Sequence, residues 1–203
     1  DLSAVIISDA AQVGGGFAVA GGVSSGFELA LLDEELELVD QWSVDADGTK
    51  VAGFVGTAGD RRFAWHDNTG VVVQIGLEDQ RRIEHPLEPD QGLGGLDQSG
   101  PWMILYTPDT QTAVLTDGED RTRELTGMGL VYTVQTDDEE GLWLVGGDTL
   151  AWLPTWDGEP EVVATREGLR GTRLVPMGPG RVAAAWLDPE VEPFQASITV
   201  HER

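Results

Sequence analysis

Residues 141–153 read GLWLVGGDTLAWL, and this stretch decides the fold. It holds two short apolar runs, residues 141–147 and 149–153, with glycine and aspartate between them. Apolar runs of about five to eight residues that end at Gly, Asp, Asn or Pro are typical of β-strands, because ordinary helices need longer runs. Glycine and aspartate favour the backbone conformations that reverse the chain. The stretch therefore predicts a β-hairpin.

The same hairpin pattern recurs five times along the chain. Its first strand is expected at residues 15–23, 61–68, 101–108, 141–147 and 181–187, and its second at 27–33, 71–77, 112–117, 149–153 and 194–200. Another apolar segment precedes each hairpin, at residues 3–8, 50–56, 92–96, 130–135 and 172–177, and a more polar strand follows four of the five. The units repeat every ~37–47 residues, close to the length of a four-stranded propeller blade.

Two segments carry a family resemblance. Residues 43–54, SVDADGTKVAGF, resemble the start of a WD40-like or TolB-type propeller blade, usually written S-P-D-G-x-x-[IV]-A-[FY]. Residues 138–144, DEEGLWL, resemble the D-x-x-G-x-[LI]-W-[IVL] repeat of bacterial regulator-type propellers. The resemblance implies an all-β protein, a β-propeller of about five four-stranded blades or an arc of a larger propeller, in a single domain over residues 1–203.

The last unit lacks its polar fourth strand in this assignment. A strand left at the edge of a sheet exposes unpaired backbone groups. Either this edge stays short and charged through His201, Glu202 and Arg203, or a partner chain covers it. A larger ring that continues beyond this unit is the third alternative.

Residues 26–40 allow two interpretations. Ser25 and Glu28 have the spacing of a helix capping box, and Leu29, Leu32, Leu36 and Val39 keep helical spacing. The repeat instead places two strands there. We favour the strands because they keep this unit in line with the other four.

Composition excludes several function classes. The chain has 36 acidic and 12 basic residues and a formal charge of −24, which argues against nucleic-acid partners and anionic membrane surfaces. No apolar run is long enough for a transmembrane helix. The absence of cysteine excludes disulfides, cysteine-ligated zinc and a thiol nucleophile. An acidic shell suits a cationic protein partner or a cation-rich setting outside the cytoplasm.

Four aspartates are candidate calcium ligands. Asp45 and Asp47 stand in a segment similar to the first half of a calcium loop, although Phe54 occupies the position of its bidentate glutamate. Asp137 and Asp138 begin a run of four acids. Solvated turns that cap backbone N–H groups are the simpler interpretation of both segments. Calcium is the only cofactor that the sequence suits, and it requires none.

Seven tryptophans are candidates for packing or for ligand binding. Trp65, Trp102, Trp143 and Trp186 fall on corresponding strands and are expected in the core. Trp152, Trp156 and the adjacent Asp157 depart from the repeat, and the two rings suit a stacking platform for a sugar or a partner side chain. Ordinary packing is the alternative for this group too.

These features favour a non-catalytic, extracytoplasmic scaffold that presents loops to a protein partner. A glycan- or calcium-binding module is the alternative. A propeller glycoside hydrolase with paired carboxylates is a further one, which needs an acid with a raised pKa. Only Glu28 lies within an apolar run where burial would raise its pKa, so the sequence offers catalysis little support.

Overall fold

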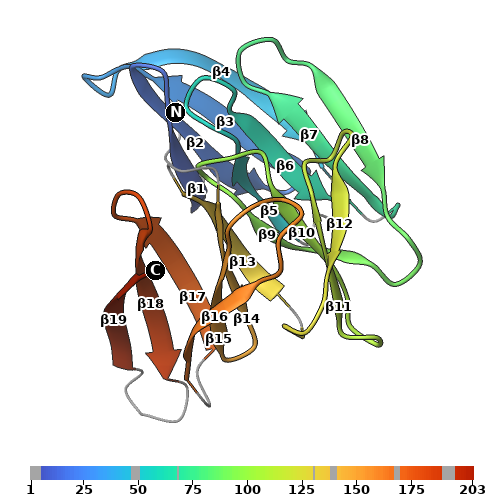
Figure 1. Ribbon diagram of the computed structural model, residues 1–203. Helices are drawn as coiled ribbons and strands as arrows, with labels where there is room; N and C mark the ends of the chain where they lie inside the picture. The colour runs from blue at the N-terminus through green and yellow to red at the C-terminus, as the bar shows by residue number, and fades with distance from the viewer. Residues whose placement is uncertain are drawn as a thin grey trace. The chain divides into compact units, whose positions relative to one another are not determined.

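The computed structural model describes residues 6–46, 51–67, 69–129, 131–137, 141–166, 170–188 and 195–203. These residues form nineteen β-strands and no helix (Figure 1). Each sheet consists of consecutive antiparallel strands. The chain divides into two compact units, residues 1–93 and 94–203, and each is described by itself. The single domain expected from the repeat stays a prediction.

Five sheets follow one another along the sequence. The first comprises β1 (Ile6–Val13), β2 (Gly16–Val23), β3 (Gly26–Leu32) and β4 (Leu38–Asp45), and the second β5 (Val51–Val55), β6 (Arg62–His66), β7 (Val71–Gly76) and β8 (Arg82–Pro86). The third comprises β9 (Gly92–Leu96), β10 (Met103–Thr107), β11 (Thr112–Thr116) and β12 (Thr122–Leu125). The fourth comprises β13 (Val131–Thr136), β14 (Leu142–Gly146), β15 (Thr149–Leu153) and β16 (Glu161–Thr165). The fifth has β17 (Arg170–Pro176), β18 (Arg181–Asp188) and β19 (Gln195–Glu202).

Three predictions from the sequence are confirmed by these strands. The chain is all-β, and its sheets have the strand content expected of propeller blades. Residues 26–40 form β3 and the start of β4 rather than a helix, and Asp33 caps the turn between them by accepting the N–H groups of Glu35 and Glu37. The fifth sheet has three strands among the described residues, so its polar fourth strand is missing there.

In the first unit, the first and second sheets pack face to face through aromatic side chains. Phe63 of β6 lies with its ring centroid 5.0 Å from Phe27 of β3 and 5.3 Å from Phe54 of β5, both in edge-on geometry. The Asp9 carboxylate accepts the Phe54 N–H at 2.8 Å and so joins β1 to β5. The buried aromatic rings and the hydrogen bond from the Phe54 backbone to the Asp9 side chain hold the two sheets together.

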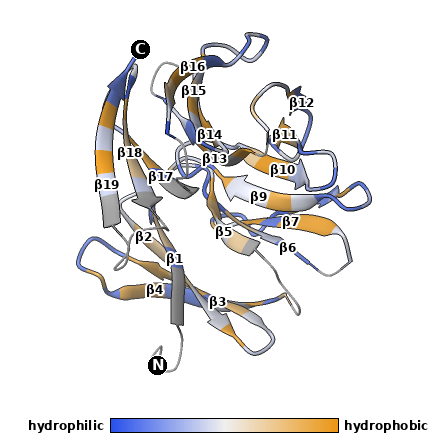
Figure 2. Cartoon of the chain, turned by 90° about the horizontal axis from the view of Figure 1, so that it is seen from below, coloured by the Kyte–Doolittle hydropathy of each residue, from blue (hydrophilic) through white to orange (hydrophobic). Residues whose placement is uncertain are grey.

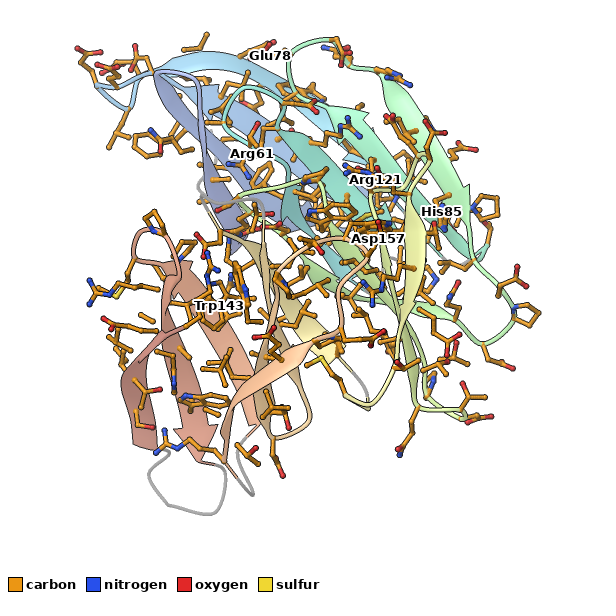
Figure 3. All side chains as sticks on the ribbon, in the orientation of Figure 1. Arg61, Glu78, His85, Arg121, Trp143 and Asp157 are labelled. Atoms are coloured by element: carbon orange, nitrogen blue, oxygen red, sulfur yellow. The ribbon has the colours of Figure 1, made fainter. Side chains whose placement is uncertain are left out.

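In the second unit, two apolar layers separate three sheets. The layer between the third and fourth sheets contains Ile104, Leu115, Leu144 and Leu153. The layer between the fourth and fifth contains Trp143 and Trp152 on one side and Val182, Ala184 and Trp186 on the other (Trp143 is labelled in Figure 3). Trp65, Trp102, Trp143 and Trp186 are all buried, as the repeat predicts.

Candidate interaction site

The fifth sheet buries one face and exposes the other. On β18, Val182, Ala184 and Trp186 are buried against the fourth sheet, whereas Ala183 and Ala185 between them are half-exposed. The register places Val175, Ala183 and Val200 in one row and Arg173, Ala185 and Ile198 in the next. We call these six residues the open face. Period-two alternation puts all six on the side away from the fourth sheet.

The open face is apolar at every position except Arg173 and is unusually exposed. Ile198, Val175 and Val200 retain 73%, 57% and 49% of their accessible surface. The two small alanines of β18 lie between these larger side chains, so the surface of the open face is recessed along β18 relative to β17 and β19. In Figure 2, β19 shows separate hydrophobic bands between paler residues. Exposed aliphatic side chains gathered on one sheet face mark an interaction surface more often than a solvated one.

The outer edge of β19 is also uncovered in the described part of the chain. β19 pairs with β18 along its whole length, from Arg181 opposite Glu202 to Asp188 opposite Gln195. The corresponding third strand of the fourth sheet, β15, pairs on both sides, with β14 and with β16. β19 therefore has the position of an inner strand, with no outer neighbour among the described residues.

The opposite face of β19 carries a chain of hydrogen bonds. Trp186 Nε1 donates to Thr199 Oγ1 at 2.9 Å, and Thr199 Oγ1 lies 2.7 Å from His201 Nε2. Arg166, which directly follows β16, donates to Ser197 Oγ at 2.8 Å. Burial and the positive charge of Arg166 lower the pKa of His201. This side of the strand is polar and lies beside a cation.

A hollow of about 410 Å³ lies beside Trp152 in the second unit. It is lined by Trp152, Pro154, Glu161, Pro179, Gly180 and Arg203. The Arg203 guanidinium lies 4.4 Å from the centre of the Trp152 ring, and the Trp143 ring centre is 4.9 Å away. Trp152 is buried, and no described residue accepts a hydrogen bond from its Nε1. A sugar could stack on this ring only after Arg203 had moved.

Trp156 and Asp157 do not share this hollow. Trp156 stacks on Trp102 with ring centres 4.7 Å apart, and Arg121 lies over the Trp102 ring at 4.4 Å. Asp157 is exposed (Arg121 and Asp157 are labelled in Figure 3). The three residues that the sequence groups as a ligand site thus have two separate sets of contacts.

The candidate calcium ligands do not form a cluster in the described residues. Asp45 is exposed at the end of β4, and Asp47 and Asp138 lie outside the described residues. Asp137 is buried, and its Oδ2 accepts the Gly180 N–H at 2.8 Å and Trp143 Nε1 at 3.3 Å. No group of three acidic or histidine side chains suited to a metal ion occurs within the part of the chain that the structure describes.

Asp97 is a buried carboxylate that the sequence did not single out. It follows β9 and joins the third sheet to the fourth by accepting Ser99 N–H, Gln135 Nε2 and the Thr136 N–H at 2.8, 3.1 and 3.1 Å. Burial raises the pKa of Asp97, although these donors act in the opposite direction. A β-carbon on Gly100 would come within 2.7 Å of the Asp97 carboxylate, so only glycine fits there. The contacts of Asp97 therefore stabilise the packing of the third sheet on the fourth.

Glu28 has an ordinary, solvated environment. Its carboxylate accepts Ser43 Oγ at 2.5 Å and Gln41 Nε2 at 3.2 Å across the β3–β4 pair. These hydrogen bonds lower the pKa of Glu28. The acid that the sequence marked for a raised pKa therefore has a lowered one, because its side chain points away from the core that covers its neighbours Phe27 and Leu29.

No protein-family profile matches the chain, and no curated protein matches it in sequence. Solved structures do match. U3-55K has a TM-score of 0.63 at 10% identity over 90% of this chain and 58% of its own. The WD40 repeats of RRP9 give 0.57 at 12% identity over 96% of this chain and 66% of theirs. An inactive virginiamycin B lyase from Staphylococcus aureus, solved with quinupristin, gives 0.59 at 11% identity over 94% and 68%.

The chain spans 58% of the first of these proteins and 66% of the second, less than two thirds of either. Among the described residues, no helix is long and apolar enough to cross a membrane. Identities of 10–12% establish the fold and leave activity open. The chain has the β-propeller fold, built from repeated antiparallel sheets like those of the WD40 proteins and the lyase.

Proposed function

We propose that the protein is a non-catalytic scaffold that binds another protein through the open face of its fifth sheet. The observation that carries this proposal is the exposure of Val175, Ile198 and Val200 on one face of a sheet whose other face packs against the fourth sheet. Protein interaction is a common use of WD40 repeats, and this chain is similar in structure to the WD40 repeats of RRP9. Buried apolar area at such a face would supply the binding free energy.

Nothing in the described carboxylates favours hydrolysis. Asp97 is buried and accepts four or more hydrogen-bond donors, so its raised pKa accompanies a structural role. We further propose that the scaffold works outside the cytoplasm, where cations would screen a formal charge of −24. Cell fractionation with an antibody against the protein tests this second part, and recovery in the cytoplasm would contradict it.

The absence of cysteine allows a direct test of the binding face. Ile198→Cys creates the only thiol of the chain, to which a photo-activated crosslinker is attached. Glu78→Cys, an exposed position outside the fifth sheet, is the matched control (Glu78 is labelled in Figure 3). In extract of the source cells, the Ile198→Cys protein should capture one protein in stoichiometric amount that the Glu78→Cys protein does not. Capture of the same mixed set by both variants would count against the proposal.

The hollow at Trp152 favours glycan binding as the second candidate function. It offers Glu161 and Arg203 as polar groups beside an indole whose N–H has no acceptor among the described residues. Titration calorimetry with envelope polysaccharide from the source cells is the test. Binding that Glu161→Ala weakens and that Ile198→Cys leaves unchanged would favour the glycan over the protein partner.

A further inference from the structure

One end of the first sheet carries an apolar surface that the proposed function does not use. Leu36, Leu38 and Val39 retain 63%, 55% and 65% of their accessible surface, and Phe17 retains 41%. The register places Phe17 opposite Leu32 and Leu32 opposite Leu38, so these three side chains form one row across β2, β3 and β4. We call these five residues the apolar tip. Exposed aliphatic and aromatic side chains that lie together mark an interaction surface.

The turn between β3 and β4 holds the apolar tip in place. Asp33 Oδ1 accepts the N–H groups of Glu35 and Glu37 at 3.0 and 2.8 Å. The Leu36 N–H donates to the Asp33 carbonyl oxygen at 3.1 Å. Figure 1 shows this turn projecting from the end of the first sheet. A surface that is ordered before binding loses little conformational entropy when a partner covers it.

Leu36 has a backbone conformation that does not suit leucine. Its φ is 65°, in the left-handed region that glycine and asparagine adopt at lower cost. The side chain is exposed, so its burial does not compensate for this strain. Strained backbone that packing does not explain is typical of functional sites. Leucine at this position suits an anchor residue that a partner covers.

The charged side chains around the apolar tip are all acidic. The described residues 6–46 include eight aspartates and glutamates and no lysine, arginine or histidine. Four of these acids are exposed on the turn and at the start of β4, namely Glu34, Glu35, Glu37 and Asp40. The outer strand β8, in contrast, pairs Arg82 with Glu84 at 2.7 Å. The described part of the first sheet supplies no cation of its own, so the apolar tip attracts a cationic partner.

Two other occupants fit this surface poorly. A second copy of the chain would bring the same acids together, and like charges repel each other. An added β-strand is disfavoured, because the register shift next to Leu32 leaves Val39 without a partner on β3 and makes the edge irregular. Asp40 Oδ1 also accepts the Gln41 N–H at 2.8 Å. The occupant is therefore held by side chains rather than by backbone pairing.

We propose that the apolar tip is a second docking site, and that it takes a basic segment of a partner protein. Aliphatic or aromatic side chains of this segment cover Leu36, Leu38 and Val39, and lysine or arginine residues on either side of them pair with Glu35 and Glu37. The site lies in the first unit and the open face in the second. Each can therefore bind without the other.

Two synthetic peptides test this site on the intact chain. The probe is a fluorescein-labelled decapeptide with central leucines flanked by lysines, and the control has serine in place of each leucine. Both peptides have the same charge, so general attraction to a protein of formal charge −24 is common to them. By fluorescence anisotropy the leucine peptide should bind saturably and at least about tenfold more tightly than the serine peptide. Binding should also slow hydrogen exchange in the turn and at the start of β4.

Leu36→Asn separates binding from stability. Asparagine adopts the left-handed conformation more readily than leucine, so the melting temperature should stay unchanged or rise, while binding of the leucine peptide should weaken about tenfold. Val162→Ser is the matched control, since Val162 on β16 is as exposed as Val39, and it should leave binding unchanged.

A pair of charge variants tests the acidic surround. The double variant Glu35→Gln, Glu37→Gln should weaken binding of the leucine peptide at low salt, and the difference should diminish as salt screens the charges. Glu78→Gln removes an exposed acid outside the first sheet and should have little effect.

Four outcomes would overturn the proposal. These are equal binding of the two peptides, exchange that changes only elsewhere in the chain, and a marked fall in the melting temperature of Leu36→Asn, which would mean that Leu36 is already packed in solution. The fourth is self-association in sedimentation that Leu36→Asn abolishes, which would make a second copy the occupant. None of them alters the outcome of capture by the Ile198→Cys protein, which tests the open face.

Discussion

The fourth and fifth sheets share one hairpin pattern and differ in how many faces they bury. On β14 all five residues are buried, because Leu142 and Leu144 pack against the third sheet while Trp143 and Val145 pack against the fifth. On β18 buried residues alternate with partly exposed ones from Val182 to Trp186. The strands of a sheet that is covered on both faces have continuous apolar sequences. In a sheet that is covered on one face only, apolar residues should alternate with polar ones along each strand.

β18 departs from that rule in an informative way. Its open positions are Ala183 and Ala185 rather than polar residues, and three of their four cross-strand neighbours, Val175, Ile198 and Val200, are aliphatic, the fourth being Arg173. The fifth sheet is therefore apolar on a face that the described residues leave exposed. The difference between the two sheets indicates that another protein surface covers the exposed face of the fifth sheet. This is the basis of the proposed function.

Trp143→Ala should have the largest effect, because it opens the layer between the two sheets. Trp143 is fully buried and its Nε1 donates to Asp137. Truncation of a buried tryptophan costs about 3–5 kcal/mol of unfolding free energy. Urea denaturation measures the loss, with Trp143→Phe as the control that keeps most of the volume. A loss under about 1 kcal/mol would mean that the fourth and fifth sheets are not held by this layer.

Asp97→Ala should have the next largest effect, about 3 kcal/mol, because it leaves Gln135 Nε2 and the N–H groups of Ser99 and Thr136 without their acceptor. Its raised pKa also gives the cost a pH dependence. In the unfolded chain Asp97 ionises near its ordinary value of 3.8, and in the folded chain at higher pH. The folded state thus holds the proton more tightly, and the stabilisation from Asp97 is greatest below 3.8 and falls as the pH rises through the folded pKa.

Urea denaturation of both proteins from about pH 3 to pH 8 checks this sign. The cost of Asp97→Ala should be greatest at acid pH and smaller at neutral pH. Asp109→Ala, at an exposed turn, serves as the control and should show a small cost without this trend. A cost that grew toward neutral pH would mean that the pKa of Asp97 is lowered in the folded protein.

Most of the fold was predictable because it depends on local signals. The hairpin at residues 141–153 needs only two apolar runs and a turn between them, and the structure has β14 and β15 there. The ambiguous residues 26–40 needed the repeat as well, since the spacing of Leu29, Leu32 and Leu36 alone allows a helix. The recurrence of the hairpin pattern along the chain decided between a helix and two strands, which the spacing of the leucines alone could not do.

The candidate site was less predictable because it depends on which faces are covered. The sequence marks Trp152 and Trp156 as a pair, but Trp152 lies on β15 and packs against Trp143, whereas Trp156 follows the end of β15 and stacks on Trp102. It marks Asp137 as a surface acid, yet the carboxylate accepts hydrogen bonds from Trp143 and Gly180 inside the second unit. Ile198 and Val200 are exposed because no described residue covers that face of the fifth sheet, and the residues themselves carry no sequence signal of it.

Gly141→Ala should have an intermediate effect and tests how tightly the fourth sheet is filled. A β-carbon on Gly141 would lie 2.0 Å from two atoms of the Trp152 ring, and that ring is held between Trp143 and Arg203. Overpacking of this kind costs about 1–3 kcal/mol. Thermal unfolding measures the cost, and Gly22→Ala, where a β-carbon meets nothing within 4 Å, is the control. Equal melting temperatures for the two variants would contradict the close approach.

Ile198→Ser should have the smallest effect on stability and a large one on binding. Ile198 is the most exposed of the large hydrophobic side chains, at 73%, so replacing it removes little buried area and should change the unfolding free energy by less than about 0.5 kcal/mol. If the open face binds a partner, the same change removes apolar area from that contact and should weaken capture of the partner about tenfold. Urea denaturation, and crosslinked capture from a thiol at the exposed position of Val200, separate the two effects. A large loss of stability would instead mean that Ile198 is already packed in solution, and the fifth sheet would then resemble the fourth.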